Sequence, residues 1–402
     1  MEHSSAFERF CSFDAMYDAS YRICRNVRWK DSTINLEENR IETVLTTEED
    51  LRECEYIQLV FSCFSIIERG KPRDIRACHI NDRLVQNSLC ENTLLPDLTP
   101  KFVYDNCATL QGKGIDFAIK RVRKHLQAAH KEYGLGNDFY GLRIDIRKYF
   151  DSIDHAALKE IARKVIRDDD VFELVSYLID TFSFKLTHDT QPVAGKQYYV
   201  SRGRRYVLFK GNHFKPHYKY YEYEERSLGL GSQTSQLLAL LTLNEIDHFV
   251  KEELHIKYYG RYMDDSYLLH NDPKYLEYCR TEIEKKLLEI GLTMNKNKTT
   301  IVRIHPIGAD NKRKEPFKYL KWNFYITQSN KLIQLPFKEK VNKQRRKLRK
   351  MHALWQEGKM TTEEVQQSYQ GWRAHMSKGN TFYIIQKMDN YFRSLFKGVE
   401  IL

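Results

Sequence analysis

Two periods of hydrophobic and polar positions alternate along the middle of this chain. Residues 138–146, DFYGLRIDI, alternate as a strand with one buried face does, and the following HAALKEIARKVIRD places its apolar residues at helical spacing. Residues 235–254 predict an apolar helix, residues 261–269 a buried hairpin, and residues 273–290 an amphipathic helix. The segment GLTMNKNKTTIVRI, which begins at Gly291, predicts a return to a strand.

The segments on either side of this middle region have different patterns. Residues 1–130 predict mostly helices, interrupted by one basic strand–turn–strand segment, ERGKPRDIRA at 68–77. Residues 196–226 contain seven tyrosines among many basic residues, which predicts an exposed, extended insertion. From about Leu332 the pattern is helical and strongly basic. The order of these elements predicts an α+β protein with a mixed centre between two flanking lobes.

Composition adds a moderate positive charge and predicts a reducing compartment. The 65 Lys and Arg residues outnumber the 54 Asp and Glu residues, so the net charge is +11, which suits a polyanionic partner. None of the eight cysteines forms a CxxC pair or has a histidine at zinc spacing, which predicts reduced thiols. The polar start MEHSSAFERF and the lack of a run of about 20 apolar residues predict a cytoplasmic protein without a membrane partner.

The candidate chemistry begins with two adjacent acidic residues in an apolar and aromatic run, RYMDDSYLL. Burying an ionised carboxylate without a partner is costly, so Asp264 and Asp265 require a cation. Alone, the string also fits a tight hairpin turn, where Asp is favoured for backbone reasons. Asp145, which follows a strand-like run, is the second candidate. Its alternative is a helix N-cap or an ion pair with Arg143 or Arg147.

Three carboxylates brought together would form a cage of oxygens of the kind that Mg²⁺ prefers, with Mn²⁺ as a substitute. Two such ions ~3.5–4 Å apart can activate an attacking hydroxyl and stabilise a leaving pyrophosphate oxygen. Three other features fit the same chemistry: the glycines of SLGLGSQTSQLLALL (227–241), Lys298 in MNKNKT and Arg73 in KPRDIR. In isolation they also fit a plain helix entry, a surface lysine and a solvated basic turn.

Taken together and in this order, these segments resemble bacterial reverse transcriptases over most of the chain, from about Arg69 to Asn380. The resemblance implies RNA-templated addition of deoxynucleotides to a primer 3′-hydroxyl, with template RNA, an RNA/DNA duplex and dNTPs as partners. It also implies a right-hand polymerase: fingers and an N-terminal helical region at 1–135, a palm at 136–330 with the Tyr-rich basic insertion at 185–226, and a basic helical thumb at 331–402.

The resemblance assigns roles to individual residues as well. For catalysis it implies Asp145, Asp264, Asp265 and Lys298, and for metal binding Asp145, Ile146, Asp264 and Asp265. For nucleotide binding it implies Lys71, Arg73, Phe150, Gly231 and Gln236, with Phe150 as the gate against a ribose 2′-hydroxyl. For template–primer binding it implies Tyr262, Met263, Tyr319, Leu320, Lys343, Arg346, Lys347 and Lys350, of which the last four share one face of a predicted helix. Lys321 departs from the glycine that is common in the primer grip of the family.

Within the family, the run Leu230-Gly231-Ser232-Gln233-Thr234-Ser235-Gln236 is similar to that of reverse transcriptases of diversity-generating retroelements. That similarity implies relaxed fidelity at template adenines, and a small basic accessory protein or a structured non-coding RNA as a partner. An antiviral-defence reverse transcriptase and an inactive RNA-binding scaffold are the alternatives. The Tyr-rich insertion fits a solvated hairpin, a surface for structured RNA, or a source of a priming tyrosine.

Overall fold

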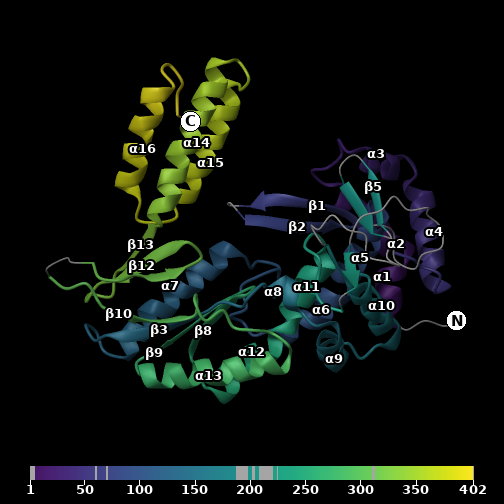
Figure 1. The fold of residues 1–402 in the computed structure, drawn as a ribbon, viewed down its shortest axis with the longest axis horizontal. Coiled ribbons are helices and arrows are strands. Elements are labelled where there is room, and N and C mark those ends of the chain that lie inside the picture. Colours follow the sequence, from purple (N-terminus) through teal and green to yellow (C-terminus); the bar gives the residue numbers. More distant parts are fainter. Residues whose placement is uncertain are drawn as a thin grey trace.

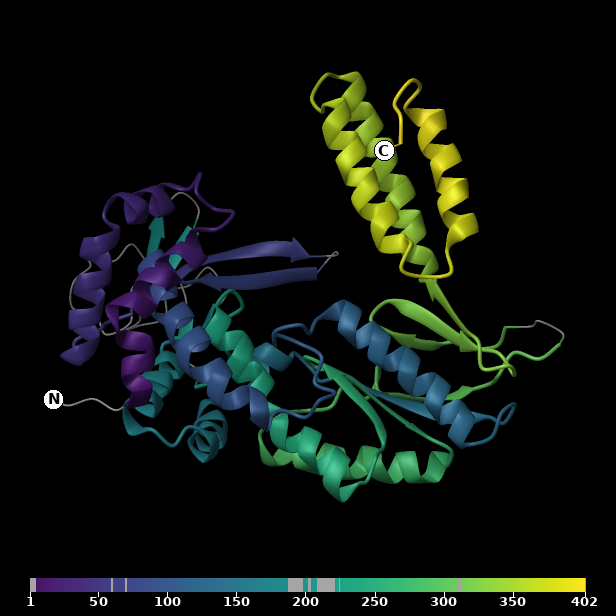
Figure 2. The ribbon, with the colours of Figure 1, turned by 180° about the vertical axis from the view of Figure 1, so that it is seen from behind.

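The computed structural model describes residues 5–58, 61–68, 71–186, 198–201, 204–207, 221–223, 225–309 and 313–401. Within these ranges the chain forms an N-terminal lobe, a central sheet with its helices, and a helical bundle that rises from the far end of the sheet (Figure 1). Figure 2 shows the same arrangement from behind. In both views a long hairpin of the N-terminal lobe points toward the helical bundle.

The N-terminal lobe packs helices around this hairpin. Its strands β1 (Phe61–Glu68) and β2 (Lys71–Ala77) pair antiparallel along their length. The predicted strand–turn–strand is therefore confirmed, although its first strand lies almost wholly before residue 68. The helices of the lobe are α1 (Ser5–Cys11), α2 (Phe13–Cys24), α3 (Asp31–Glu38), α4 (Arg40–Arg52), α5 (Ile80–Leu89), the π turn η1 (Cys90–Leu94), α6 (Leu95–Leu98) and the 3₁₀ turn η2 (Thr99–Lys101).

The central sheet has the strand order β10-β3-β9-β8, and all of its neighbours run antiparallel. Its strands are β3 (Phe139–Ile144), β8 (Tyr258–Tyr262), β9 (Asp265–His270) and β10 (Thr300–Ile304), which confirms the predicted strands. One face packs on α13 (Pro273–Glu289), through Leu142 and Ile283 among others. The other face packs on α7 (Ile115–Glu132), through Phe139 and Val122 among others. Helices therefore cover both faces of the sheet.

Between β3 and β8 the chain forms helices at the side of the sheet that faces the N-terminal lobe (Figure 1). They are α8 (Tyr149–Ser152), α9 (His155–Val165), α10 (Asp169–Asp180), α11 (Gln233–Thr242), α12 (Asn244–His248) and the π turn η3 (Phe249–Glu253). The single apolar helix predicted at 235–254 is therefore wrong, because the helix breaks at Leu243. Tertiary hydrogen bonds accompany this break: Asn244 donates to the carbonyl of Lys101 at 3.2 Å, and Asp247 accepts from Arg261.

The C-terminal region begins with a small sheet. Its strands β11 (Phe317–Tyr319), β12 (Trp322–Ile326) and β13 (Leu332–Pro336) pair in chain order. Three helices follow, α14 (Lys338–Gln356), α15 (Thr362–Met376) and α16 (Phe382–Leu395). The prediction that helix begins near Leu332 is wrong, because Leu332 to Pro336 alternate between buried and half-buried positions and complete the sheet.

The loop between α15 and α16 anchors the helical bundle to the rest of the chain. The backbone nitrogen of Asn380 donates to the carbonyl of Gln334 at 2.8 Å, and the backbone nitrogen of Gln334 donates to the side chain of Asn380 at 2.8 Å. Lys378 forms an ion pair with Asp116 of α7 at 2.7 Å. Gly379 lies against Trp322, where an added Cβ would be 2.7 Å from the indole ring. These contacts join the bundle to the small sheet and to α7.

The predicted Tyr-rich insertion lies largely outside the described residues. Its described parts are short strands, β4 (Phe184–Leu186), β5 (Tyr198–Ser201), β6 (Arg204–Val207) and β7 (Tyr221–Tyr223). β6 joins the sheet of the N-terminal lobe by pairing with β1. The roles predicted for the tyrosines of this segment stay predictions.

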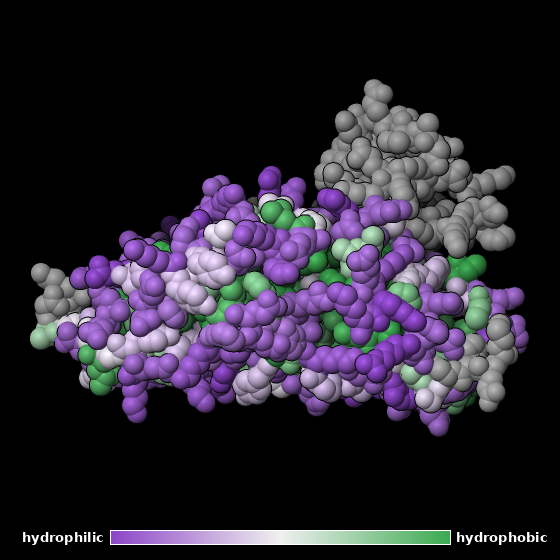
Figure 3. Space-filling view, turned by 90° about the horizontal axis from the view of Figure 1, so that it is seen from below, coloured by the Kyte–Doolittle hydropathy of each residue, from purple (hydrophilic) through white to green (hydrophobic). Residues whose placement is uncertain are grey.

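Two general expectations can be compared with the described residues. All eight cysteines are free thiols, and only Cys54 is exposed. Within the described ranges, none of the helices combines the length and the apolar character needed to cross a membrane. Seen from below, the surface is mostly hydrophilic, with hydrophobic side chains in scattered patches (Figure 3).

Candidate active site

The end of β3 meets the hairpin of β8 and β9, which brings the predicted carboxylates together. β3 pairs with β9 through Ile144↔Ser266, and Asp145 and Asp265 continue this register by one residue. Burial raises the pKa of both Asp264 and Asp265, and the nearby charge of Asp145 raises each of them further. Acidic groups more than a hundred positions apart in the sequence therefore share one electrostatic environment.

Asp264 projects from a two-residue turn, because β8 and β9 close through Tyr262↔Asp265. The first turn residue, Met263, has a φ of 54°, in the left-handed region that glycine usually occupies in such turns. A methionine held there carries backbone strain, and strain of this kind persists only where the surroundings enforce it. Arg261 supplies part of that enforcement, since its guanidinium donates to the carbonyl of Met263 at 3.1 Å.

Asp145 is held by the loop that follows α13. The ammonium of Lys298 lies 2.9 Å from one carboxylate oxygen of Asp145 and 3.1 Å from the other. The side chain of Asn295 donates to the same carboxylate at 2.8 Å, and the backbone nitrogen of Asn295 donates to the carbonyl of Asp145 at 2.8 Å. The ion pair of Asp145 is therefore with Lys298, and not with Arg143 or Arg147 as the alternative interpretation proposed.

Electrostatics around the hairpin disfavour two neighbouring negative charges. Burial, the charge of Asp264 and the charge of Asp145 together raise the pKa of Asp265 to about 6, while Arg143 and Lys298 act in the opposite direction. Burial raises the pKa of Asp264 as well. Lys298 and Arg73 both favour the charged form of Asp264. A cation bound between these groups would remove the repulsion that the two carboxylates impose on each other.

The oxygen donors suit a hard divalent cation, but the side chains are not arranged around one. Throughout the part of the chain that the structure describes, no three His, Cys, Asp or Glu side chains are grouped so that they could hold a metal ion. Asp145 is bound to Lys298 and Asn295 instead. A bound Mg²⁺ would be held by Asp145, Asp264 and Asp265 once the Lys298 ammonium had left the carboxylate of Asp145. The Lys298 side chain is half-exposed, so its ammonium can be solvated away from Asp145.

The glycine motif predicted for nucleotide binding docks against β2, the strand that carries Arg73. The backbone nitrogen of Arg76 donates to the carbonyl of Leu230 at 3.0 Å. Gly231 has a φ of 132°, and a Cβ at this position would lie 3.1 Å from the carbonyl oxygen of Arg76. Only glycine tolerates both the positive φ and this close contact with the Arg76 carbonyl. Gly231 therefore sets how closely the segment before α11 approaches β2. Arg73 is exposed on the same strand.

Phe150 and Gln236 complete the predicted nucleotide set. Phe150 is half-buried, and its carbonyl accepts a hydrogen bond from the backbone of Leu228 at 2.9 Å, directly before the glycine motif. Gln236 is exposed on the first turns of α11. The backbone of Lys71 lies in β2, but its side chain lies outside the described residues. The structure thus brings Phe150 to the glycine motif, while the nucleotide contacts themselves stay predictions.

The predicted primer grip is a hairpin of β11 and β12. Leu320 and Lys321 form its two-residue turn, with φ of 44° and 66°, so both adopt the left-handed conformation of a type I′ turn. Lys321 therefore keeps the turn that a glycine would make, at the cost of strain. Tyr319 is only 1% exposed, and its hydroxyl donates to the carbonyl of Asp265 at 3.3 Å. Buried in this way, Tyr319 does not contact a primer directly; its hydroxyl instead supports the β8–β9 hairpin.

The family of the chain follows from a comparison with known families. The family described as reverse transcriptase (RNA-dependent DNA polymerase) matches residues 68–324, which is more than half of the chain. The chain belongs to the reverse transcriptase family. The matched range contains Asp145, Asp264, Asp265 and Lys298, and the right-hand fold expected from the sequence is the fold of this family.

Comparisons with individual proteins are less close. No curated protein matches the sequence of the reverse transcriptase significantly. Among solved structures, telomerase from Candida tropicalis, truncated from its C-terminal domain, is 12% identical with a TM-score of 0.45, and the match covers 73% of this chain and 60% of the telomerase. Telomerase from Candida albicans with a fragment of telomeric RNA is 12% identical with a TM-score of 0.44, covering 85% and 61%. The chain thus spans about 60% of the length of these telomerases.

The basic face predicted for the template–primer duplex is present on α14 of the reverse transcriptase. Lys343, Arg346, Lys347 and Lys350 are all exposed, while Gln344, Leu348 and Met351 on the same helix are buried. The helix therefore separates its charged and buried residues as the spacing predicted. Contact of the four cations with a duplex stays a prediction.

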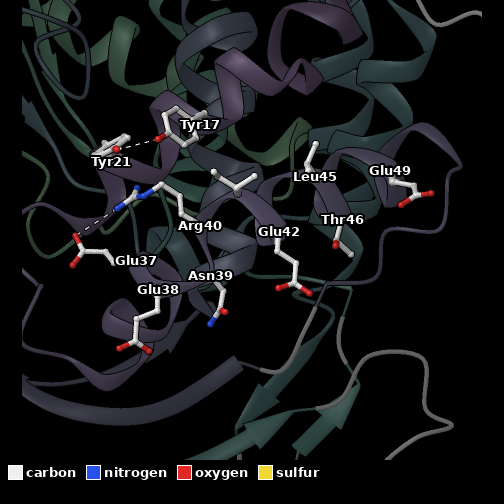
Figure 4. A pocket seen from close by; sticks show the side chains of 11 residues that line it. Tyr17, Tyr21, Glu37, Glu38, Asn39, Arg40, Glu42, Leu45, Thr46 and Glu49 are labelled. Atoms are coloured by element: carbon white, nitrogen blue, oxygen red, sulfur yellow. Dashed lines mark hydrogen bonds and ion pairs between the residues drawn. The ribbon is translucent and has the colours of Figure 1, made fainter.

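A pocket of ≈ 730 Å³ lies far from the catalytic carboxylates, between α2, α3 and α4 (Figure 4). It is lined by Glu37, Glu38, Glu42 and Glu49, and its one cation, Arg40, pairs with Glu37 at 3.6 Å. Four carboxylates repel a triphosphate or a phosphodiester chain, so this pocket does not fit a nucleotide or the template. Positive charge is found at the carboxylate hairpin instead, where Lys298 and Arg73 favour the charged form of Asp264.

Sequence reasoning missed two supports of this site. The first is the buried ion pair of Arg261 and Asp247, in which two guanidinium nitrogens bind the two carboxylate oxygens at 2.5 and 2.7 Å. The side chain of Arg261 is 2% exposed and that of Asp247 0%. The second is Asn295, which holds Asp145. An arginine inside an otherwise apolar strand was the available signal for the first; the second had none beyond its position three residues before Lys298.

Proposed function

We propose that this reverse transcriptase is an RNA-directed DNA polymerase that extends a primer 3′-hydroxyl with deoxynucleotides on an RNA template and releases pyrophosphate. The observation that carries the proposal is the meeting of Asp145 with the Asp264–Asp265 hairpin inside the matched family range. Divalent ions held there would activate the primer hydroxyl and stabilise the leaving oxygen. The chain's own residues position these carboxylates: Asn295 holds Asp145, and Tyr319 holds the backbone of Asp265.

The incoming nucleotide is proposed to bind between Arg73 on β2 and the carboxylate hairpin, since the charge of Arg73 acts on Asp264. Arg73 on β2 would bind phosphate oxygens, since a guanidinium forms a bidentate fork with them. Lys298 would stabilise the departing pyrophosphate and supply its proton when it is released from Asp145. Phe150 would contact the ribose, because its backbone bonds to the segment that leads into the glycine motif. These assignments are supported by the shared location of the residues.

The test is extension of a DNA primer on an RNA template by the full chain with Mg²⁺. Asp264→Ala is expected to reduce single-turnover incorporation by several orders of magnitude, because metal positioning serves both the nucleophile and the leaving group. Asp18→Ala is the matched control, since Asp18 is an exposed carboxylate on α2, far from the hairpin. Extension by Asp264→Ala at the wild-type rate, or wild-type extension in the presence of a chelator, would contradict the proposal.

The biological role proposed is mutagenic copying in a diversity-generating retroelement, with Mg²⁺, a template repeat RNA and a small basic accessory protein or structured non-coding RNA as partners. Leu230 supports it, because this aliphatic residue precedes the docked Gly231 at the position where the resemblance implies relaxed fidelity. Sequencing of the cDNA made by the protein on a defined RNA is expected to show substitutions concentrated at template adenines, and Leu230→Gln is expected to reduce them. Equal error rates at all four bases would contradict this role.

A further inference from the structure

A groove of ≈ 500 Å³ lies on the outer side of α7, away from the catalytic hairpin. One wall is α7, and the other is the turn between β12 and β13 at Asn330. The polar side chains that line the groove are Lys120, Arg123, Lys124, Gln127, Lys131 and Asn330. Four of these are cationic and none is acidic, so the groove is the chemical opposite of the acidic pocket at α2–α4 (Figure 4).

The charged residues of α7 that line the groove lie on its outer side, apart from its other charged residues. Arg121 turns toward the interior of the molecule and binds Asp105 at 2.6 Å. The two acidic residues of the helix, Asp116 and Glu132, lie near its two ends and are neutralised by Lys378 and Lys257. No carboxylate of α7 is therefore left to compensate the lysines that line the groove.

The lysines of the groove have no counter-charge. Lys120, Lys124 and Lys131 are exposed, and none of them forms an ion pair with another residue in the described ranges. They recur four and seven residues apart, so they lie along one face of the helix over about 16 Å, at about 1.5 Å per residue. Like charges four residues apart on a helix repel each other. An extended anion would remove that repulsion.

The groove is held rigid by contacts beneath it. Gln127 donates to the carbonyl of Asn330 at 3.0 Å, and the side chain of Asn330 lies 3.0 Å from Nδ1 of His130. Arg123 donates to the buried side chain of Gln334 at 2.9 Å. The distance between the helix and the turn is therefore fixed before any ligand binds, which lowers the ordering cost of binding.

We propose that this groove binds the phosphate backbone of a base-paired RNA segment, as a second nucleic-acid site outside the catalytic centre. A row of lysines without acidic neighbours suits phosphates, which position a nucleic acid without reading its sequence. No aromatic side chain lines the groove, whereas unpaired strands are typically bound by stacking of their bases on aromatic rings. The choice of RNA rests on the proposed function, since the template of an RNA-directed polymerase is the RNA it must retain.

The experiment measures how salt weakens binding of the full chain to a blunt 20-base-pair RNA duplex. In the triple variant with Lys120→Gln, Lys124→Gln and Lys131→Gln, the slope of log affinity against log salt is expected to become less steep by about 3, roughly one for each phosphate that a lysine no longer neutralises. The same variant should incorporate a single nucleotide at the wild-type rate on a saturating short RNA/DNA primer–template. An unchanged slope would overturn the proposal.

The matched control replaces three lysines of α13 by glutamine, Lys274, Lys285 and Lys286, because α13 covers the opposite face of the central sheet. It removes the same charge and should leave the slope unchanged; an equal decrease would show a general charge effect and overturn the site. The affinity of the α7 variant for the short RNA/DNA primer–template is compared with that of the wild type as well. If it falls by the same factor as the affinity for the RNA duplex, the groove holds the product duplex and a separate RNA site is refuted. Failure of the proposed function is read separately, as a lack of incorporation by the wild-type chain.

Discussion

Asp265 offers a test of whether the hairpin is built to hold a cation. Burial, Asp264 and Asp145 raise the pKa of this carboxyl from 3.8 to about 6. A pKa difference of about 2 units corresponds to about 3 kcal/mol, at about 1.4 kcal/mol per unit. The charged carboxylate therefore destabilises the metal-free fold at neutral pH. Replacing Asp265 by asparagine removes this cost, so Asp265→Asn is expected to raise the free energy of unfolding by about 1–3 kcal/mol.

The sign of this effect sets its pH dependence. In the folded chain the pKa of Asp265 is raised, so the folded state binds a proton more readily than the unfolded state does. The free energy of unfolding of the wild-type chain therefore falls as pH rises from about 4 to about 6, the interval between the unfolded and folded pKa values. Below this interval the carboxyl is neutral in both states. Residue 265 should then contribute the same free energy of unfolding in the wild type and in Asp265→Asn.

The assay is thermal unfolding of the metal-free chain at pH 8 and at pH 4, with and without Mg²⁺. At pH 8 the variant should melt at a higher temperature than the wild type, by about 1 °C per kcal/mol, because the entropy of unfolding grows with the 402 residues of the chain. Mg²⁺ at a hundred times its dissociation constant should stabilise the wild type by about 2.7 kcal/mol, and the variant by less. Added Mg²⁺ should therefore reduce the difference in melting temperature between the two proteins. Asp18→Asn is the control, as an exposed carboxylate on α2. A variant that is no more stable than wild type at pH 8, or equally more stable at pH 4, would refute the reasoning.

Three further changes have expected outcomes. Asp247→Ala leaves the guanidinium of Arg261 buried without its partner and should cost about 3–5 kcal/mol, measured by thermal unfolding, whereas a cost below about 1 kcal/mol would contradict a buried pair. Gly379→Ala places a Cβ 2.7 Å from Trp322, so it should reduce the number of nucleotides added per binding event while the rate of the first addition stays unchanged. Lys321→Gly relieves a φ of 66° and should stabilise the chain by about 1 kcal/mol; destabilisation would show that the turn is not strained.

The strands, the catalytic hairpin and most of the helices around them could be predicted from the sequence, because each is encoded by a local pattern. The period of two in residues 139–144 indicated β3, and the adjacent carboxylates in an apolar run indicated the turn at Asp264. The break of the predicted long helix at Leu243 could not be predicted in this way. It depends on hydrogen bonds to Lys101 and Arg261, which are distant in sequence, and neither proline nor glycine marks it.

The residues that position the carboxylates could not be predicted from the sequence, for the same reason. Asn295 reaches Asp145 across 150 positions, and nothing in the local sequence of either residue indicates the partner. The buried arginine at 261 was visible as a charge in an apolar strand, but its partner Asp247 reads as an ordinary polar position near the end of the predicted apolar helix. Likewise, the resemblance assigned Tyr319 to template–primer binding, whereas Tyr319 proves to be buried beneath the hairpin. Local patterns thus indicate candidate reacting groups more readily than the groups that position them.

Several residues in and near the carboxylate hairpin adopt a left-handed backbone that their residue types disfavour. Met263, Leu320 and Lys321 adopt φ values of 54°, 44° and 66°, and Lys148, three residues after Asp145, adopts 47°. A sequence chosen for stability alone would place glycine or asparagine at such positions. Met263 directly precedes Asp264, a carboxyl whose pKa burial and the charge of Asp145 raise. Strained turns and disfavoured charges therefore coincide at the catalytic hairpin and its neighbour, and the buried Arg261–Asp247 pair and the packing of Tyr319 against Tyr267 are what hold that region in place.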